Sequence, residues 1–244
     1  MNLVVETLKN TPTFHSFIAS AVLLGFVSTS HADLSLNFSS TVGSTIQFNG
    51  TNSSFQFNAS TSTLFGGSFL GSQWQIGSES GGAGSAVLLL GLFNNGPFQY
   101  GAITTNINGP DIDESATVTG PLAALLIQDA TGNLSADLDW GQIATHDNAG
   151  TINGSLTINV TGFVYTGSNP DLMTLAASGP GGLDLTFQFS PGMTLADLTT
   201  GAGPYQTSYS GSLSVPEPRS ISCFLLGLGV LVFCQRFRGN RNHN

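Results

Sequence analysis

Apolar side chains alternate with polar ones along much of the chain, and this period of two constrains the fold more than any other feature. Leu34, Leu36 and Phe38 alternate with serine and asparagine, and residues 183–189 repeat the pattern. Successive side chains of a β-strand point to opposite faces, so the spacing predicts strands with one buried and one solvated face. The positions predicted to be buried are Leu34, Leu36, Phe38, Phe55, Phe57, Leu156, Ile158, Leu185 and Phe187.

Turn-forming pairs separate these runs, as at Asn49-Gly50 and Asn108-Gly109. They recur about every 8–12 residues, a spacing that is typical of antiparallel all-β folds. We therefore predict an antiparallel β-sandwich of the jelly-roll or Ig-like kind.

Helical signals are few. The segments Pro170–Ala177 and Met193–Thr199 predict one or two short helices. The runs Val87–Phe93 and Leu122–Ile127 are more continuously apolar, and periodicity alone leaves them open between central strands and short helices.

The basic residues lie only near the two ends of the chain. The sequence has 5 Lys and Arg residues, and none lies between Ala32 and Pro218. All 14 acidic residues except Glu6 and Glu217 lie within residues 33–197. Nucleic acids and anionic membrane surfaces require cationic side chains, so neither is an expected partner of the middle of the chain. Divalent cations and neutral glycans remain candidate partners.

The N-terminal end has the form of a signal peptide. Residues 17–27 are an uncharged apolar run, and Ser30-His31-Ala32 places small residues at the two positions that signal peptidase recognises. We expect cleavage after Ala32 and a mature chain that starts at Asp33. A retained N-terminal anchor is the alternative, although the run is short for a bilayer.

The C-terminal end has three ordered parts. Val215-Pro216-Glu217-Pro218 precedes an apolar run over residues 221–234, and Arg236, Arg238 and Arg241 follow it. This order resembles the sorting tail of the PEP-CTERM family. The resemblance covers only about the last 30 residues. The processing residues that the two ends predict are Ala32, Val215, Pro216, Glu217 and Pro218.

The resemblance implies that an exosortase processes the tail, while the three arginines hold it on the cytoplasmic side. The chain then divides into a signal peptide (1–32), a secreted β-domain (33–214) and a sorting tail (215–244). We expect apolar helices to flank the domain and to be the only parts of the chain that contact the membrane. An ordinary single-span anchor is the alternative for the tail.

For function, the resemblance implies an exported surface or matrix protein, non-catalytic and associated with exopolysaccharide. The alternative is a secreted polysaccharide-acting hydrolase or a carbohydrate-binding protein. A hydrolase would need two facing carboxylates, and Glu79 and Glu114 are the only glutamates within residues 33–214. His146 is the only histidine there, and its neighbour Asp147 would point to the opposite face of a strand. We predict no catalytic residues.

Two Asp-x-Asp pairs are the candidate metal ligands: Asp111 with Asp113, and Asp137 with Asp139. Each would place two carboxylates on one face of a strand, and Ca²⁺ prefers such oxygen ligands. The alternative is a solvated acidic surface, and no other cofactor is expected.

Six aromatic residues could stack on sugar rings or pack in the core, and the sequence leaves both roles open. They are Trp74, Trp140, Tyr100, Tyr165, Tyr205 and Tyr209.

Overall fold

Antiparallel strands make up most of the protein, as the alternation predicts. The computed structural model describes residues 33–50, 52–58, 71–94, 96–120, 123–148 and 151–216. Strands account for 62% of them, and two short helices complete the fold. The all-β prediction is confirmed, and both apolar runs that were left open contain strands.

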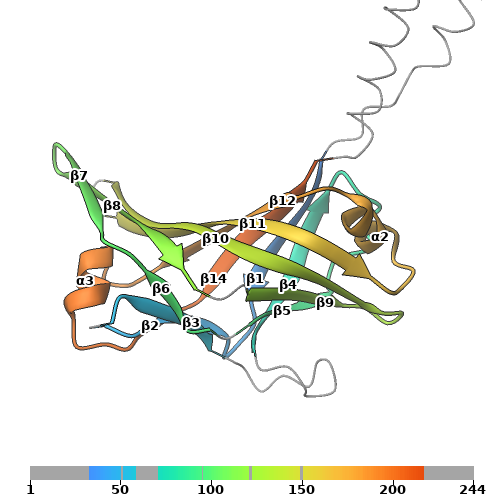
Figure 1. Ribbon diagram of the computed structural model, residues 1–244, viewed down its shortest axis with the longest axis horizontal. Helices are drawn as coiled ribbons and strands as arrows, with labels where there is room; N and C mark the ends of the chain where they lie inside the picture. Colours follow the sequence, from blue (N-terminus) through green and yellow to red (C-terminus); the bar gives the residue numbers. More distant parts are fainter. Residues whose placement is uncertain are drawn as a thin grey trace, which may run out of the picture. The chain divides into compact units, whose positions relative to one another are not determined.

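Eight strands form a closed antiparallel ring (Figure 1). Each ring strand pairs with the ring strand that follows it in chain order, with the inserted strands left out of the count. The last strand, β14, pairs with the first, β1, and this closes the ring. In order, the ring strands are β1 (Leu34–Ser40), β4 (Gly71–Ser80), β5 (Leu90–Asn94), β9 (Ala123–Gln128), β10 (Asn133–Asn148), β11 (Thr151–Tyr165), β12 (Gly181–Gln188) and β14 (Tyr209–Val215).

The predicted β-sandwich is therefore corrected to an up-and-down barrel. Alternation marks one face of each strand as buried, and that face can look into a barrel as well as onto a second sheet. Closure depends on pairings that alternation does not encode, such as those between β10 and β11 and between β1 and β14.

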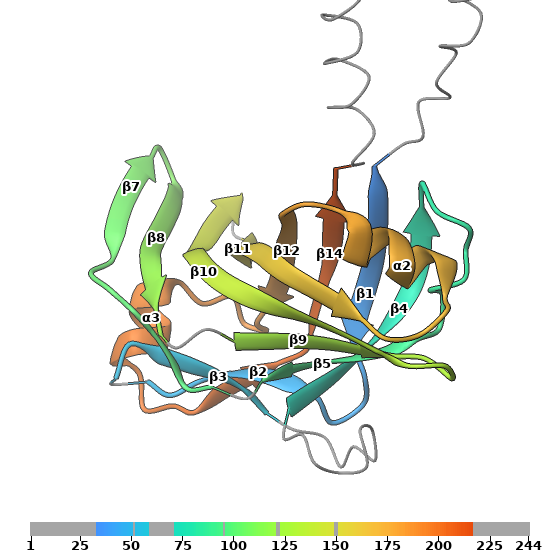
Figure 2. The same cartoon turned by 45° about the vertical axis from the view of Figure 1, so that its right-hand side comes forward.

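The remaining strands are insertions between neighbouring ring strands (Figure 2). β10 is long enough to pair with β9 through its first half and with β8 through its second half. A register shift between Trp140 and Gln142 marks the change of partner. The inserted strands are β2 (Thr45–Phe48), β3 (Ser54–Asn58), β6 (Phe98–Tyr100), β7 (Thr104–Asn108), β8 (Asp111–Thr119) and β13 (Tyr205–Thr207).

An aromatic core runs from the barrel into the sheet formed by β13, β2, β3 and β6. Phe57 of β3 lies at its centre, with its ring centroid 5.2 Å from that of Phe93 and 5.3 Å from that of Tyr209. On β2, the ring centroid of Phe48 lies 5.2 Å from that of Phe187 on β12. All nine positions that the alternation predicts to be buried are at most 4% exposed.

The two helices lie at opposite ends of the domain in Figure 1. α2 (Pro170–Ala177) has the predicted bounds, and Asn169 caps it by accepting from the amides of Asp171 and Leu172. α3 (Leu195–Thr200) begins at a capping box formed by Thr194 and Asp197. Among the residues that the structure describes, no helix is long and apolar enough to cross a membrane.

The barrel begins and ends at neighbouring residues. Leu34, the first residue of β1, is the direct ladder partner of Val215, the last residue of β14. Both side chains are buried. The predicted terminal helices lie outside the described residues.

Candidate functional site

Two carboxylates at the α2 end of the domain share one backbone loop. Asp171 accepts from the amides of Ala83 and Ser85, both at 2.6 Å. Glu79 accepts from the amides between and after them, Gly84 at 2.8 Å and Ala86 at 3.1 Å. Four consecutive N–H groups therefore alternate between two acidic side chains. We call this arrangement the carboxylate clasp.

The clasp holds Asp171 in its charged form. Burial alone would raise the pKa of Asp171, but hydrogen bonds outweigh it and lower the pKa below its ordinary value. The donors are the Ser85 hydroxyl and the Ala83 and Ser85 amides. Sequence reasoning singled out Glu79 but missed Asp171, because Asp171 is separated in the chain by 88 residues from Ala83 and by 86 from Ser85, the loop residues that it binds.

A third acidic side chain, Asp129, supports the same end. Asp129 accepts from the hydroxyl of Tyr165 at 2.6 Å and from the amides of Thr131 and Gly132. Burial opposes ionisation of Asp129, but these bonds lower its pKa. The Tyr165 hydroxyl also accepts from the amide of Asn169, the α2 cap. Tyr165 is thus a structural link between a loop and a helix.

Glu114 lies at the other end, beneath α3. It is 5% exposed and accepts from the amide of Ala196 at 2.8 Å. Its ladder partner Thr145 accepts from the amide of Leu195 at 3.2 Å. Glu114 also contributes to a raised pKa of Tyr100, in which burial is the larger cause. The two candidate hydrolase glutamates thus lie beside different helices, each bound to backbone amides.

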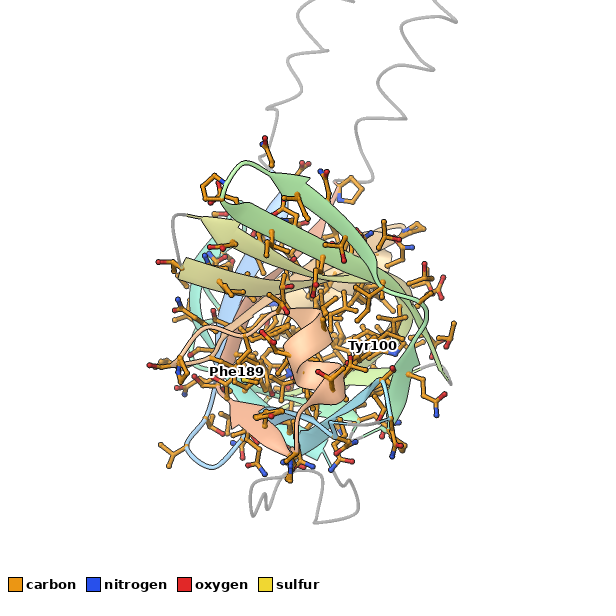
Figure 3. The ribbon with its side chains drawn as sticks, turned by 90° about the vertical axis from the view of Figure 1, so that its left-hand side faces the viewer. Tyr100 and Phe189 are labelled. Atoms are coloured by element: carbon orange, nitrogen blue, oxygen red, sulfur yellow. The ribbon has the colours of Figure 1, made fainter. Side chains whose placement is uncertain are left out.

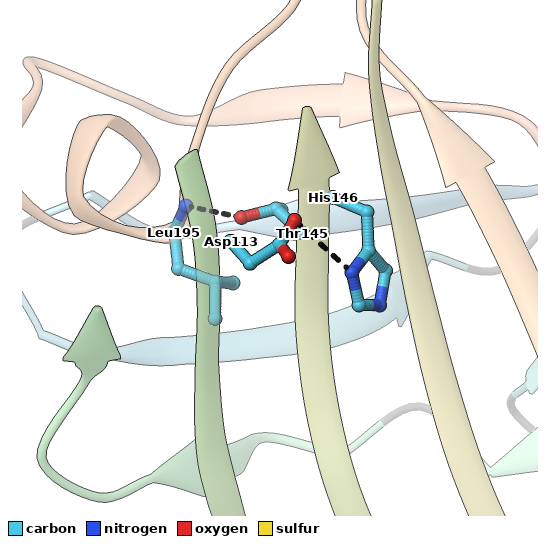
Figure 4. A network of polar contacts seen from close by, with 4 residues as sticks. All are labelled: Asp113, Thr145, His146 and Leu195. Atoms are coloured by element: carbon cyan, nitrogen blue, oxygen red, sulfur yellow. Dashed lines mark hydrogen bonds and ion pairs between the residues drawn. The ribbon is translucent and has the colours of Figure 1, made fainter. Parts of the chain in front are cut away.

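His146 lies across the ladder from Asp113. The two residues are direct partners on β10 and β8, and Nδ1 of His146 lies 3.4 Å from Oδ1 of Asp113 (Figure 4). The side chains are 59% and 41% exposed, so this contact is open to solvent and of small energetic weight. Thr145, one residue earlier, points inward to α3.

The Asp-x-Asp pairs lie on outward faces of strands. Asp137 and Asp139 are exposed on β10, and Asp111 and Asp113 are half-buried on β8. No group of three or more His, Cys, Asp or Glu side chains gathers around a metal-sized space in the described ranges. Each pair supplies only two side chains, whereas Ca²⁺ takes six to eight oxygen ligands.

Most of the candidate stacking aromatics belong to the core. Trp74, Trp140, Tyr100 and Tyr209 are at most 8% exposed. Tyr165 and Tyr205 are half-buried and pack against the core. An aromatic ring that sequence reasoning did not single out, Phe189, is half-buried at the surface beyond β12. Figure 3 shows Phe189 and Tyr100 on either side of α3.

Beside Phe189 runs a groove whose lining is uncharged. Its larger part has a volume of about 620 Å³, and a second hollow of about 310 Å³ adjoins it through Gln188. We call both parts together the polar groove. The larger part is lined by Ser39, Ser40, Asn153, Thr186, Phe187, Gln188, Ser208, Tyr209 and Ser210. The second hollow is lined by Thr151, Ile152, Gln188, Phe189, Ser190 and Gly192.

The groove forms where four strand ends meet. Ser39 and Ser40 end β1, Tyr209 begins β14, and Gln188 ends β12 beside the start of β11. These are the ends of β1 and β14 that lie away from Leu34 and Val215. The alternation of apolar and polar residues predicts that the polar residues at these strand ends are exposed to solvent. It does not predict that they lie together, because that depends on the order of the strands in the ring.

A second uncharged surface lies on the outer face of β13, β2 and β3. Gln206, Gln47 and Gln56 form one row across the three strands. Their carboxamides are bonded within the sheet: Gln206 donates to Gln47 at 2.6 Å, and Gln56 donates to Asn58 at 3.0 Å. We call this surface the amide row.

Two of the predicted processing residues, Val215 and Pro216, are described by the structure and lie at the end of the barrel. Val215 is the buried last residue of β14, and Pro216 is the exposed residue that follows it. The other residues predicted for processing and topology lie outside the described ranges. They are Ala32, Glu217, Pro218, Arg236, Arg238 and Arg241.

Comparison with known proteins assigns no family to this arrangement. No protein-family model, no curated protein and no solved structure matches the chain.

Proposed function

We propose that this is an exported surface or extracellular-matrix protein whose mature part is the barrel. Signal peptidase would cut after Ala32, and an exosortase would cut at Pro216-Glu217-Pro218. Arg236, Arg238 and Arg241 would hold the tail at the cytoplasmic side of the membrane until that cut. The PEP-CTERM resemblance of the tail motivates this proposal.

The position of the barrel ends is the observation that carries it. Only Asp33 separates the first cut from Leu34, and Pro216 directly follows Val215. Both cuts would therefore fall just outside the ring and leave every ladder between its strands paired. Because Leu34 and Val215 are ladder partners, both removed segments would depart from the same edge of the barrel.

A non-catalytic role in an exopolysaccharide matrix is the second part of the proposal. Glu79 and Glu114, the only glutamates within residues 33–214, lie beside different helices and accept from backbone amides. A glycosidase needs two carboxylates within about 5–10 Å on either side of one bond. Asp171 shares a loop with Glu79, but it is 2% exposed and accepts from the Ala83 and Ser85 amides, so it does not face an open substrate position. The uncharged groove and amide row instead suit reversible contact with a hydroxyl-rich polymer.

Mass spectrometry of the secreted protein tests the processing. We expect an N-terminus at Asp33 and no peptide from residues 221–244. The Glu217→Ala variant should remain in the membrane fraction, whereas Ser214→Ala, an exposed change within β14, should be released as the wild type is. A mature protein that still carries Arg236 to Asn244 would contradict the C-terminal half of the proposal.

Assays on the native polysaccharide test the non-catalytic role. We expect no depolymerisation by the purified protein. Cleavage that disappears in Glu79→Gln or Glu114→Gln, with the fold retained, would instead favour the hydrolase alternative.

A further inference from the structure

We propose that the polar groove is a binding site for a segment of neutral polysaccharide. The assignment rests on the proposed function for its biological setting, but its physical basis is the lining of the groove. That lining combines uncharged hydrogen-bonding groups with an aromatic ring, and the two hollows have the volumes usual for ligand sites.

The polar groups of the groove can both donate and accept hydrogen bonds. Asn153 and Gln188 are direct ladder partners on β11 and β12, and both side chains are exposed. Two carboxamides therefore lie side by side at the junction of the two hollows. Sugar hydroxyls also donate and accept, so hydroxyls and carboxamides are complementary to them.

Several of these groups are already held in place. The hydroxyls of Thr186 and Ser210 are 3.1 Å apart, and the amide of Tyr209 donates to the Ser40 hydroxyl at 3.1 Å. The Thr207 hydroxyl donates to the backbone carbonyl of Gln188 at 2.6 Å. This bond anchors the end of β12, and the side-chain carboxamide of Gln188 takes no part in it. Binding would then cost less conformational entropy than ordering free side chains.

Phe189 supplies an apolar surface for the C–H face of a sugar ring. Its ring packs edge-on against Phe48 and Phe187, at centroid distances of 5.9 and 6.1 Å. These contacts fix the ring while leaving the side chain half-exposed in the smaller hollow. Aromatic faces held in this way contribute to recognition beside a few oriented polar groups.

The charge of the domain selects neutral polymers. No lysine or arginine lies between Ala32 and Pro218, and no charged residue lines the groove. A uronate or sulfate group would meet a negative domain with no lysine or arginine to pair with it, and the imidazole of His146, the ladder partner of Asn153, already lies beside Asp113. The groove should therefore bind neutral glycans in preference to acidic ones.

Affinity electrophoresis of the purified full-length chain tests this assignment, with dextran, galactomannan, a mixed-linkage β-glucan or alginate in the gel. At least one neutral polymer should retard the wild type, and alginate should not. The double variant Asn153→Ala with Gln188→Ala should bind that polymer about tenfold or more weakly, because both carboxamides are lost. Phe189→Leu should also weaken binding while keeping an apolar contact with Phe48.

The matched control is Gln56→Ala with Gln206→Ala, which removes two carboxamides from the amide row. It should bind as the wild type does, and circular dichroism should show the same melting for both double variants. Retardation by no neutral polymer, equal retardation by alginate, or unchanged binding in the groove variant would each overturn the site. Loss of binding only in the control would assign the glycan to the amide row instead. A groove-dependent interaction in a chain that is neither exported nor cut would overturn the proposed function but keep the site.

Discussion

Gly91 of β5 lies directly beneath the indole ring of Trp74, its ladder partner on β4. A side chain on Gly91 would collide with that ring. The same relationship recurs between Gly154 and Phe187. A glycine that faces a large ring across the ladder lets the ring pack over the glycine backbone. Such glycine–aromatic pairs occur where a sheet is strongly curved.

The variant Gly91→Ala should therefore be destabilised by about 1–3 kcal/mol, because the added methyl group overpacks the core. Urea denaturation monitored by tryptophan fluorescence measures this change. Gly77→Ala on β4, the strand that carries Trp74, is the control, since an added Cβ there meets no atom within 4 Å. Its stability should be unchanged or raised by less than about 1 kcal/mol. Equal losses in the two variants would contradict the packing argument.

The carboxylate clasp should make the domain sensitive to acid. The pKa of Asp171 lies below its ordinary value of 3.8 in the folded state, so folding favours the charged form. This stabilisation is present above the unfolded pKa and is lost as the pH falls through the lower folded pKa. Melting temperatures should therefore fall as the pH drops below about 4.

The variant Asp171→Asn should lose about 1–3 kcal/mol at neutral pH, because its NH₂ group faces N–H donors that the carboxylate accepts. Its stability should also change less with pH in the acid range. Asp184→Asn, an exposed change on β12, serves as the control. An acid response in Asp171→Asn as steep as that of the wild type would rule out Asp171 as its source.

Alkali should destabilise the domain through Tyr209. Burial raises its pKa well above the ordinary value of 10, and the hydrogen bond to Ser72 offsets this only in part. A raised folded pKa gives stability that is complete below the unfolded pKa and lost as the pH rises above about 10. Tyr209→Phe should cost about 1 kcal/mol at neutral pH and should flatten this alkaline loss. Urea titrations at increasing pH measure both effects, and a wild-type stability that is constant above pH 10 would contradict them.

Thr145 should be needed for α3 to dock on the sheet. Its hydroxyl is fully buried and accepts from the first helical amide, so Thr145→Val should cost about 1–2 kcal/mol with little change in shape. The adjacent change His146→Ala removes only a solvent-exposed contact with Asp113 and should cost less than about 0.5 kcal/mol. Thermal melts of the two variants compare these neighbours directly, and similar values would contradict the inward role of Thr145.

Much of the secondary structure follows from local chemistry. The alternation of Leu34, Leu36 and Phe38 predicts both the strand and its buried face, and the bounds of α2 are those of the predicted helix. Asn169 and Pro170 begin that helix through a side-chain cap and a proline at its first position. These preferences act over a few residues, so they are visible in the sequence alone.

The closure of the sheet, the clasp and the groove were decided only by tertiary structure. Leu34 pairs with Val215, Ala83 binds Asp171, and Asn153 lies beside Gln188. Alternation determines which side of a strand is buried but carries no information about its neighbour, because every amphipathic strand offers the same backbone ladder. Fitting the large rings opposite small residues in a closed barrel depends on all eight strands together. The partners of Leu34, Asp171 and Gln188 therefore emerge only once the whole core is packed.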